Sequence, residues 1–250
     1  MSRTAKALAY INQEGFVTVT QLCGEFGISE STARRLLTGL AEQRLVQRVH
    51  GGAAALERSR SASMVIRQNT NRETKQRIAQ KACGIINEDS TLILMGGTNV
   101  AAICPFIKNM RLTVITNSFL VFNALQYSST VRLIFLGGLF NPQEYEVGGV
   151  LANQGLRFIR ADYLFMGAAS FDERSGFITA TPAVELYISC MEISSTVCVL
   201  VDSSKYHSGG VGVTAKPNNV HYLFTDTGLP AEAIEQFKST GMRIVLAEKA

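Results

Sequence analysis

Residues 28–43 read Ile-Ser-Glu-Ser-Thr-Ala-Arg-Arg-Leu-Leu-Thr-Gly-Leu-Ala-Glu-Gln, and this stretch decides the fold of the first part of the chain. From Ala33 onward, apolar residues recur at i, i+3, i+4 and i+7, as on the buried face of a helix. Ser29 precedes the pattern and can cap the helix N-terminus. The opposite side carries short polar residues and two adjacent arginines. We predict an amphipathic helix over residues 30–43 with a polar, basic face.

The flanking segments extend this pattern to a larger motif. Residues 16–22 open a helix with capping-box spacing between Thr18 and Gln21, and Gly27 ends that helix. After residue 43, residues 45–54 form two short strands around a glycine turn, with Arg48 and His50 near the tip. A short helix, a glycine turn and a second helix with polar N-terminal residues make a helix-turn-helix. Residues 1–53 are therefore predicted as three helices and a hairpin, a winged helix-turn-helix.

The polar face of the second helix is suited to DNA. Arginine reaches base acceptors in the major groove, and hydroxyls reach phosphates. The candidate DNA-binding residues are Ser29, Ser31, Thr32, Arg34, Arg35, Thr38, Arg48 and His50. Residues 1–81 carry 13 Lys/Arg against 6 Asp/Glu, whereas residues 82–250 carry 11 against 14, so the basic end is the one expected to meet a polyanion. The alternative is a small helical docking domain with a solvated basic face.

The rest of the chain has the pattern of an α/β domain. Residues 54–72 lack periodicity and indicate a linker, so we predict domains at 1–56 and 73–250 with a linker at 57–72. A helix is expected over 73–86. Apolar runs then occur at 91–95, 112–116, 131–136, 163–168, 197–202, 222–225 and 243–246, mostly separated by stretches long enough for helices. This alternation predicts a parallel, Rossmann-like sheet covered on both faces.

Ligands of open α/β sheets bind at the carboxyl ends of strands, and several of the apolar runs end in glycine or polar residues. Gly96-Gly97-Thr98-Asn99 offers backbone N–H groups to an anion, and Lys205 can add a full positive charge. Other polar groups can bind hydroxyls. The candidate ligand residues from strand ends are Gly96, Gly97, Thr98, Asn99, Asn117, Ser118, Gly137, Gly138, Glu185 and Lys205. Each glycine pair, taken alone, is better explained as a plain turn, and it is the occurrence of several such strand ends together that favours a ligand site.

Composition excludes other classes. No run of about 18 apolar residues appears, so no membrane helix is expected. The N-terminus lacks the pattern of a secretory signal. Five scattered cysteines indicate small buried hydrophobes in a reducing compartment, and three histidines far apart give no zinc spacing. We expect a cytoplasmic protein with no membrane partner, metal or cofactor.

With these motifs in place, the chain resembles the DeoR family of bacterial regulators. Ile28-Ser29-Glu30-Ser31-Thr32-Ala33-Arg34-Arg35 followed by Arg48-Val49-His50-Gly51-Gly52-Ala53 is similar to that family's recognition helix and wing. Leu36 is a departure, because the family usually has Asp there. The resemblance continues through Val114-Ile115-Thr116-Asn117-Ser118, Leu136-Gly137-Gly138, Asp162-Tyr163-Leu164-Phe165-Met166-Gly167, Glu185 and Val201-Asp202-Ser203-Ser204-Lys205. It implies an effector domain similar in fold to ribose-5-phosphate isomerase, a phosphosugar ligand, and Asp162 as a further site residue.

Two departures bear on the chemistry. The family's phosphate loop usually reads Asp-Ser-Gly-Thr-Thr, whereas this chain has Met95-Gly96-Gly97-Thr98-Asn99, so the effector can be atypical, bound more weakly or absent. The isomerase uses two acids in an Asp-Gly-Ala-Asp-Glu loop, and Phe165 stands where the second would be. Glu185 alone lacks a partner for proton transfer, and fold similarity does not carry catalysis with it.

Three hypotheses follow. The leading one is a DNA-binding transcription regulator, a repressor of a carbohydrate operon, that binds double-stranded operator DNA and responds to a phosphorylated sugar. The second is a sugar-phosphate isomerase or deaminase with an appended nucleic-acid domain. The third is a DNA-binding protein whose larger domain serves only for oligomerisation. We expect a homodimer or homotetramer, since one winged helix covers too little DNA for operator affinity.

Overall fold

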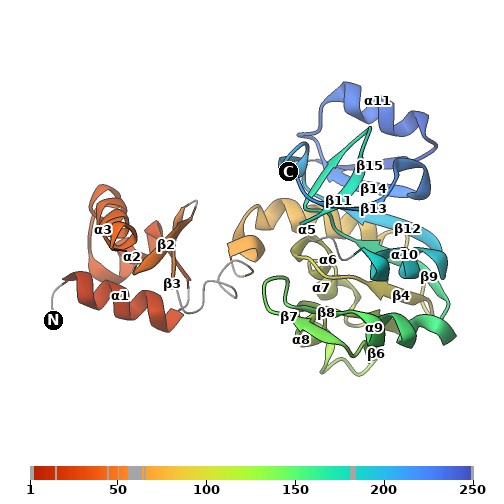
Figure 1. Cartoon of the computed structure of the whole chain (residues 1–250), viewed down its shortest axis with the longest axis horizontal. Helices are drawn as coiled ribbons and strands as arrows, with labels where there is room; N and C mark the ends of the chain where they lie inside the picture. The colour runs from red at the N-terminus through yellow and green to blue at the C-terminus, as the bar shows by residue number, and fades with distance from the viewer. Residues whose placement is uncertain are drawn as a thin grey trace. The chain divides into compact units, whose positions relative to one another are not determined.

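The computed structural model describes residues 3–14, 16–43, 45–49, 51–55, 64, 66–180 and 184–248. The chain forms two compact units, Met1–Thr70 and Asn71–Ala250 (Figure 1). Among the described residues, no helix has both the length and the apolar character needed to span a membrane. The two units are described separately below.

The N-terminal unit contains a three-stranded antiparallel sheet and the helices α1 (Arg3–Glu14), α2 (Val19–Phe26) and α3 (Glu30–Glu42), and residues 66–69 are also helical. The sheet has the order β1 (Phe16–Thr18), β3 (Gly52–Ala55), β2 (Val46–Val49). The expectation that residue 16 opens a helix was wrong. Val17 is buried and pairs with Ala53, so residues 16–18 form a strand, and Thr18 then caps α2.

The core of this unit takes side chains from α1, α2, α3 and the sheet. Leu22 of α2, Leu37 and Leu40 of α3, and Ile11 of α1 are fully buried. Each such side chain contributes roughly 1.5–3 kcal/mol through burial of apolar surface. The apolar face expected for α3 is therefore confirmed, although Leu36 at its margin is only partly buried.

The C-terminal unit is built on a seven-stranded parallel sheet. Its order is β15-β14-β12-β9-β4-β5-β6, and every neighbouring pair is parallel. The strands are β4 (Thr91–Leu94), β5 (Leu112–Thr116), β6 (Val131–Phe135), β9 (Ala161–Met166), β12 (Ser194–Leu200), β14 (Tyr222–Asp226) and β15 (Arg243–Ala247). All seven predicted runs are strands of this one sheet.

The two faces of the sheet contribute to two separate hydrophobic cores, because successive side chains of a strand point to opposite faces. On β4, Leu92 and Leu94 pack with α5 (Arg72–Cys83), α6 (Thr98–Ala101), α7 (Cys104–Ile107) and α8 (Phe119–Leu125). Ile93 faces the other side, where α9 (Val150–Gly155), α10 (Glu185–Glu192) and α11 (Ala231–Ser239) complete the second core. The helices on the two sides of the sheet can be followed in Figure 1. Strand order reverses between β4 and β9, and in such sheets the crevice for ligands opens at this point.

Smaller elements stand at the carboxyl edge of the sheet, and the apolar runs did not predict them. A hairpin joins β7 (Leu139–Asn141) to β8 (Glu146–Gly148), and a second sheet contains β10 (Ser170–Asp172), β11 (Gly176–Thr179) and β13 (Gly212–Ala215). Among the described residues, short 3-10 helices are η1 (Leu156–Phe158), η2 (Ser203–Lys205) and η3 (Pro217–Asn219), and η1 and η3 lead into the amino ends of β9 and β14. Helix α5 ends at Cys83, three residues before the expected end, because Gly84 follows in a turn.

Candidate functional site

The N-terminus of α3 is held by a cluster of hydroxyl groups. The Ser29 Oγ accepts the Thr32 backbone N–H at 3.4 Å and lies 3.0 Å from the hydroxyls of both Ser31 and Thr32. Helix α2 begins with a capping box formed by Thr18 and Gln21. Gly27, at φ +60°, ends α2 in the left-handed conformation. The turn between the two helices is thus fixed at both ends, which sets the direction of α3.

The two arginines of α3 are in different environments. The Arg34 Nη2 donates to Glu30 Oε2 at 3.2 Å, one turn earlier on the exposed face. The Thr38 hydroxyl donates to the Arg34 carbonyl oxygen. Arg35 is exposed and makes no hydrogen bond or ion pair with any described residue. Arg35 is therefore the arginine of this face whose donors are available to an external acceptor.

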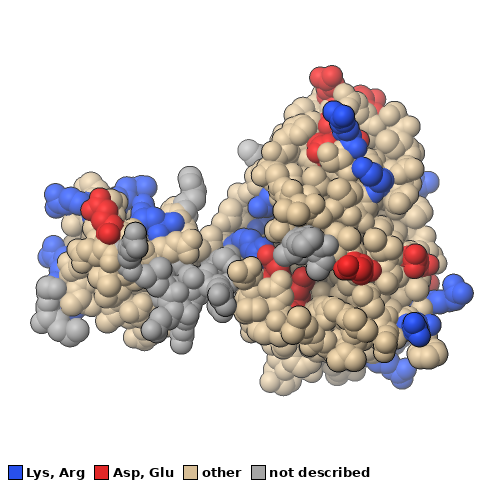
Figure 2. Space-filling view, viewed as in Figure 1, with Lys and Arg blue, Asp and Glu red and all other residues tan. Residues whose placement is uncertain are grey.

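The hairpin formed by β2 and β3 matches the expected wing. Gly51 lies in its turn at φ +81°, a conformation that favours glycine. The Arg48 Nη1 donates to the Gly52 carbonyl oxygen, so one end of this guanidinium braces the hairpin. His50 lies outside the described residues. Figure 2 shows that basic side chains predominate among the charged groups on the visible face of this unit.

At the carboxyl end of β4, the glycine loop faces a carboxylate. Gly97 lies at φ +116° and precedes α6, which is only one turn long and so provides a smaller dipole than a full helix. A Cβ on Gly96 would overlap Oε2 of Glu146, which reaches the loop from β8. Glycine at this position therefore makes room for Glu146.

A buried carboxylate connects the glycine loop to the start of the unit. Asp202 is 1% exposed and follows β12. It accepts from the amide nitrogens of Asn99 at 3.3 Å and Asn71 at 3.2 Å, and from the Ser204 hydroxyl. Burial by itself would raise the pKa of Asp202, but these hydrogen bonds and the charge of the buried Lys75 hold the pKa below its ordinary value.

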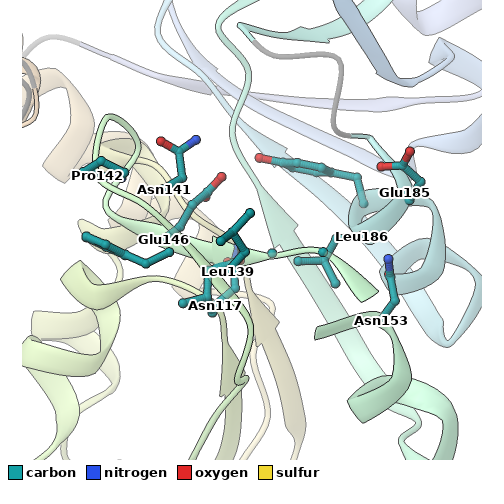
Figure 3. Close-up of a pocket in the computed structure, with 13 residues that line it drawn as sticks. Asn117, Leu139, Asn141, Pro142, Glu146, Asn153, Glu185 and Leu186 are labelled. Atoms are coloured by element: carbon teal, nitrogen blue, oxygen red, sulfur yellow. The ribbon is translucent and has the colours of Figure 1, made fainter. Parts of the chain in front are cut away.

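A pocket of about 390 Å³ opens between the β7–β8 hairpin and α10 (Figure 3). Its polar lining includes Asn117, Glu146 and Glu185. Other lining residues are Leu139, Phe140, Asn141, Pro142, Val147, Gly148, Gly149, Asn153, Leu186 and Tyr187. The structure thus brings together Asn117 and Glu185, two residues singled out from the sequence on different segments.

The remaining sequence candidates lie in three places. Ser118, fully buried beside Asn117, has a hydroxyl without a hydrogen-bond partner among the described residues. Lys205 ends η2, directly after the loop held by Asp202. Gly137 and Gly138 follow β6 but do not line the pocket, and a Cβ on Gly138 would overlap the Gly148 carbonyl oxygen. The second glycine is therefore explained by packing against the hairpin.

The expectation for Asp162 needs correction. Asp162 lies in the first half of β9, at the amino edge of the sheet, and its carboxylate accepts the Thr91 backbone N–H at 2.7 Å. The glycine loop follows the opposite end of the neighbouring β4. Asp162 therefore ties two strand starts together and does not reach the pocket.

Sequence reasoning missed three polar residues of this region, Lys75, Glu146 and Tyr187. Glu146 lies in the β7–β8 hairpin, between two glycine pairs, and this flanking was the available signal. Lys75 has the helical spacing of the apolar residues Ile78 and Ala82 and is 5% exposed, an unusual degree of burial for a lysine. Tyr187 gave no signal, because an aromatic residue on a helix usually belongs to the core.

No cysteine occurs among the described residues that line the pocket. The described residues contain no group of His, Cys, Asp and Glu that could hold a metal ion. Cys104, Cys190 and Cys198 are buried and Cys83 is partly buried, and burial raises the pKa of all four thiols. These cysteines are protonated at neutral pH, in agreement with the role of small apolar side chains.

A helix-turn-helix with an exposed arginine, joined to a sensor-type α/β unit with a pocket at its strand ends, defines a DNA-binding transcription regulator. Models of known protein families match both parts of the chain. Residues 3–59 match the DeoR-like helix-turn-helix domain, and residues 70–227 match the DeoR C terminal sensor domain. The chain belongs to the DeoR family.

The chain is similar along most of its length to several transcription regulators. The chain is 31% identical to the transcriptional repressor AccR of Agrobacterium fabrum, over 90% of this chain and 89% of that protein. It is 30% identical to the glycerol-3-phosphate regulon repressor of Escherichia coli, over 90% of both chains. Ribose 5-phosphate isomerase A of Methanocaldococcus jannaschii is similar to 54% of this chain and matches over 55% of its own length, with a TM-score of 0.41 and 17% identity. The named relatives are regulators and not enzymes, and Phe165 is fully buried inside β9.

Proposed function

We propose that this regulator represses a carbohydrate operon in the bacterial cytoplasm and that a phosphorylated sugar controls it. Relatives named for the glycerol-3-phosphate regulon, the aga operon and the lactose phosphotransferase system support this choice of genes. An L-fucose operon activator is also among the relatives, so the sign of regulation rests on the greater number of repressors.

The observation that carries the DNA-binding half of the proposal is the exposed guanidinium of Arg35 on α3, which pairs with no described residue. In a helix-turn-helix, the N-terminal part of the second helix contacts base edges. Arg35 can therefore donate to two acceptors of a guanine, while Ser31 and Thr32 reach phosphates and Arg34, already paired with Glu30, adds mainly charge. Ser29, Thr38 and Arg48 position the helix and the wing.

For the ligand, we place the phosphate near Gly97, Thr98 and Lys205, with the sugar body toward Asn117 and Glu185. Asn99 and Ser204 support this arrangement, because both hydrogen-bond to Asp202 and so hold the glycine loop and the Lys205 segment together. Buried polar groups normally have partners, and a ligand can supply those that the Asn117 and Ser118 oxygens lack among the described residues.

A route for the signal is available through the same carboxylate. Asp202 accepts from Asn99 in the glycine loop and from Asn71, which directly precedes α5 at the start of the C-terminal unit. A ligand that reorders the loop changes what Asp202 can hold, and this alters the segment from which the DNA-binding unit extends. Such a ligand acts only through its differential affinity for two arrangements, and a coupling of about 1–3 kcal/mol changes operator affinity about 5–150-fold.

We further propose a homodimer or homotetramer assembled through the C-terminal unit. The continuous segment α9–η1 exposes Val150 at 71%, Leu151 at 70% and Phe158 at 95%, and the nearby Leu139 is 81% exposed. These large, exposed side chains form an apolar patch, and such patches on soluble proteins mark interaction sites. A standard interface buries about 800 Å² per partner, a little over half of it apolar, so a second copy of the chain fits this patch.

A thermal-shift panel of phosphorylated sugars tests the ligand, because a compound that binds only the folded state raises its stability. We expect one sugar phosphate to raise the melting temperature and to change the mobility of a complex between the full chain and its operator. If no sugar phosphate does either, the proposed control by ligand is wrong, while DNA binding without any ligand would still support the regulator.

A further inference from the structure

Helix α3 (Figure 1) presents two different flanks beside Arg35. Successive residues of a helix lie about 100° apart around its axis, so Arg34 and Leu36 stand on opposite sides of Arg35. The Arg34 flank is charged, because Arg34 pairs with Glu30 one turn earlier. The structure describes α3 in full, and its other flank consists of Thr32, Leu36 and Gly39, without a charged side chain. We call this surface the Leu36 flank.

Gly39 lies on the Leu36 flank, one turn after Arg35 and Leu36, and contacts within the described residues do not account for it. Its φ is negative, so the backbone does not require glycine. A Cβ at Gly39 would meet no atom of the described residues within 4 Å outside the helix's own backbone, so packing does not require glycine either. Glycine inside a helix is less stable than alanine, because its backbone loses more freedom on folding. A surface that approaches from outside the chain does account for an uncovered helix backbone, and for the second helix of a helix-turn-helix that surface is DNA.

Leu36 is the apolar side chain of this flank. It packs in part against the core of the N-terminal unit, and the rest of the side chain is exposed. In the major groove, thymine presents a C5-methyl group that apolar side chains contact. Leu36 lies about 1.5 Å further along the helix axis than Arg35, so it faces a base pair close to the one that Arg35 would contact.

We propose that Leu36 contacts a thymine methyl group in the operator, and that Gly39 lets the wall of the major groove come close enough for this contact. The inference rests on the proposed contact of Arg35 with guanine and adds a second base to the recognised sequence. Each half-site then contains a thymine within about two base pairs of that guanine. Leu36 selects by apolar contact and Arg35 by hydrogen bonds, so a change in the DNA that removes only a methyl group separates the two.

Deoxyuridine provides that change, because it lacks the C5-methyl group of thymidine and keeps the same base pairing. Fluorescence anisotropy of the full-length protein would compare an operator selected from random sequence with versions in which one thymine of each half-site, in turn, is deoxyuridine. Loss of one buried methyl group costs about fourfold in affinity, and therefore about 15-fold for two half-sites. We expect this loss at a thymine within about two base pairs of the guanine whose replacement no longer changes the affinity of Arg35→Ala.

A leucine variant then assigns the methyl preference to its residue. Leu36→Ala should bind the thymine and deoxyuridine operators with affinities within about twofold of each other, because the apolar contact is gone. Leu45→Ala is the matched control, since Leu45 is a 39% exposed leucine of the same unit that lies outside α3. It should keep the wild-type ratio of the two affinities.

A glycine variant separates DNA binding from folding. Alanine favours the helix, so Gly39→Ala should slow amide hydrogen exchange in α3, while operator affinity should fall at least about fivefold. Gly24→Ala is the matched control, because Gly24 also lies inside a helix, α2, and a Cβ there would meet no atom of the described residues within 4 Å. It should slow exchange in α2 without weakening operator binding.

The outcomes distinguish this inference from the proposed function. If no deoxyuridine lowers the affinity while Arg35→Ala loses specificity, the inference is overturned and DNA recognition through Arg35 stands. An effect only at thymines further from the guanine, or a methyl preference that Leu36→Ala retains, overturns the assignment to Leu36. Wild-type operator affinity of Gly39→Ala overturns the close approach. If Arg35→Ala keeps its specificity, both proposals fail. The deoxyuridine comparison uses the wild-type protein and remains decisive if Leu36→Ala does not fold.

Discussion

Replacing Arg35 with alanine should remove specific DNA recognition while the protein stays folded. Arg35 is exposed on α3 and makes no hydrogen bond or ion pair with a described residue, so its loss leaves no buried group unsatisfied. Surface substitutions of this kind change stability by about 0.5 kcal/mol or less. Arg34 on the same helix is the matched control, because its guanidinium is already paired with Glu30 at 3.2 Å.

The expected magnitude follows from the base recognition that Arg35 would provide in each half-site. A bidentate hydrogen bond to a base contributes about 1–3 kcal/mol of discrimination, and a dimer on a two-fold operator makes it twice. Arg35→Ala should therefore cost about 2–6 kcal/mol, or roughly 30-fold to 10⁴-fold in specific affinity. Arg34→Ala should weaken specific and nonspecific binding alike, since a phosphate contact carries no sequence information.

Fluorescence anisotropy at one fixed salt concentration measures both variants against an operator selected from random sequence and against unrelated DNA. Circular dichroism melting checks that each variant is folded. The reasoning is refuted if folded Arg35→Ala binds the operator with wild-type affinity, or if Arg34→Ala loses specificity and Arg35→Ala keeps it, because the helix would then present a different side to the groove.

Other perturbations test the sensor unit. Lys205→Ala should bind operator normally but need at least tenfold more ligand for release in a gel-shift titration, and a wild-type response would contradict the placement of the phosphate. Because the pKa of Asp202 lies below its ordinary value, this residue stabilises the fold above about pH 4, and the contribution is lost as pH falls through the folded pKa. Asp202→Asn should thus lower the free energy of unfolding in urea by about 1–3 kcal/mol at pH 7 and by less at pH 3, and an equal loss at both would count against it. Phe158→Asp should shift sedimentation toward the monomer, whereas an unchanged oligomer would place the interface elsewhere.

The sequence by itself determined those helices and strands whose pattern of buried residues can be recognised within a single segment. A helix with apolar residues at helical spacing shows its period wherever it packs, so α3 and its Ser29 cap could be predicted from residues 28–43 alone. The five inner strands of the sheet are largely buried on both faces and therefore appear as nearly continuous apolar runs. The candidate ligand residues that follow these strands were proposed from the sequence because parallel strands end at a common edge.

Tertiary structure decided what depends on partners distant in sequence. Residues 16–18 are too few to display a strand period, and they become β1 only because β3 supplies the pairing hydrogen bonds. Asp162 satisfied a motif, yet the direction of β9 places it in the first half of the strand, at the amino edge of the sheet. The hairpin that places Glu146 against Gly96 contains no apolar run from which it could be predicted. The spacing of residues along the sequence does not show that Glu146 and Gly96 are in contact. The charge of the pocket depends on these tertiary contacts, because a carboxylate interacts most strongly with groups a few ångströms away in space, whatever their separation along the chain.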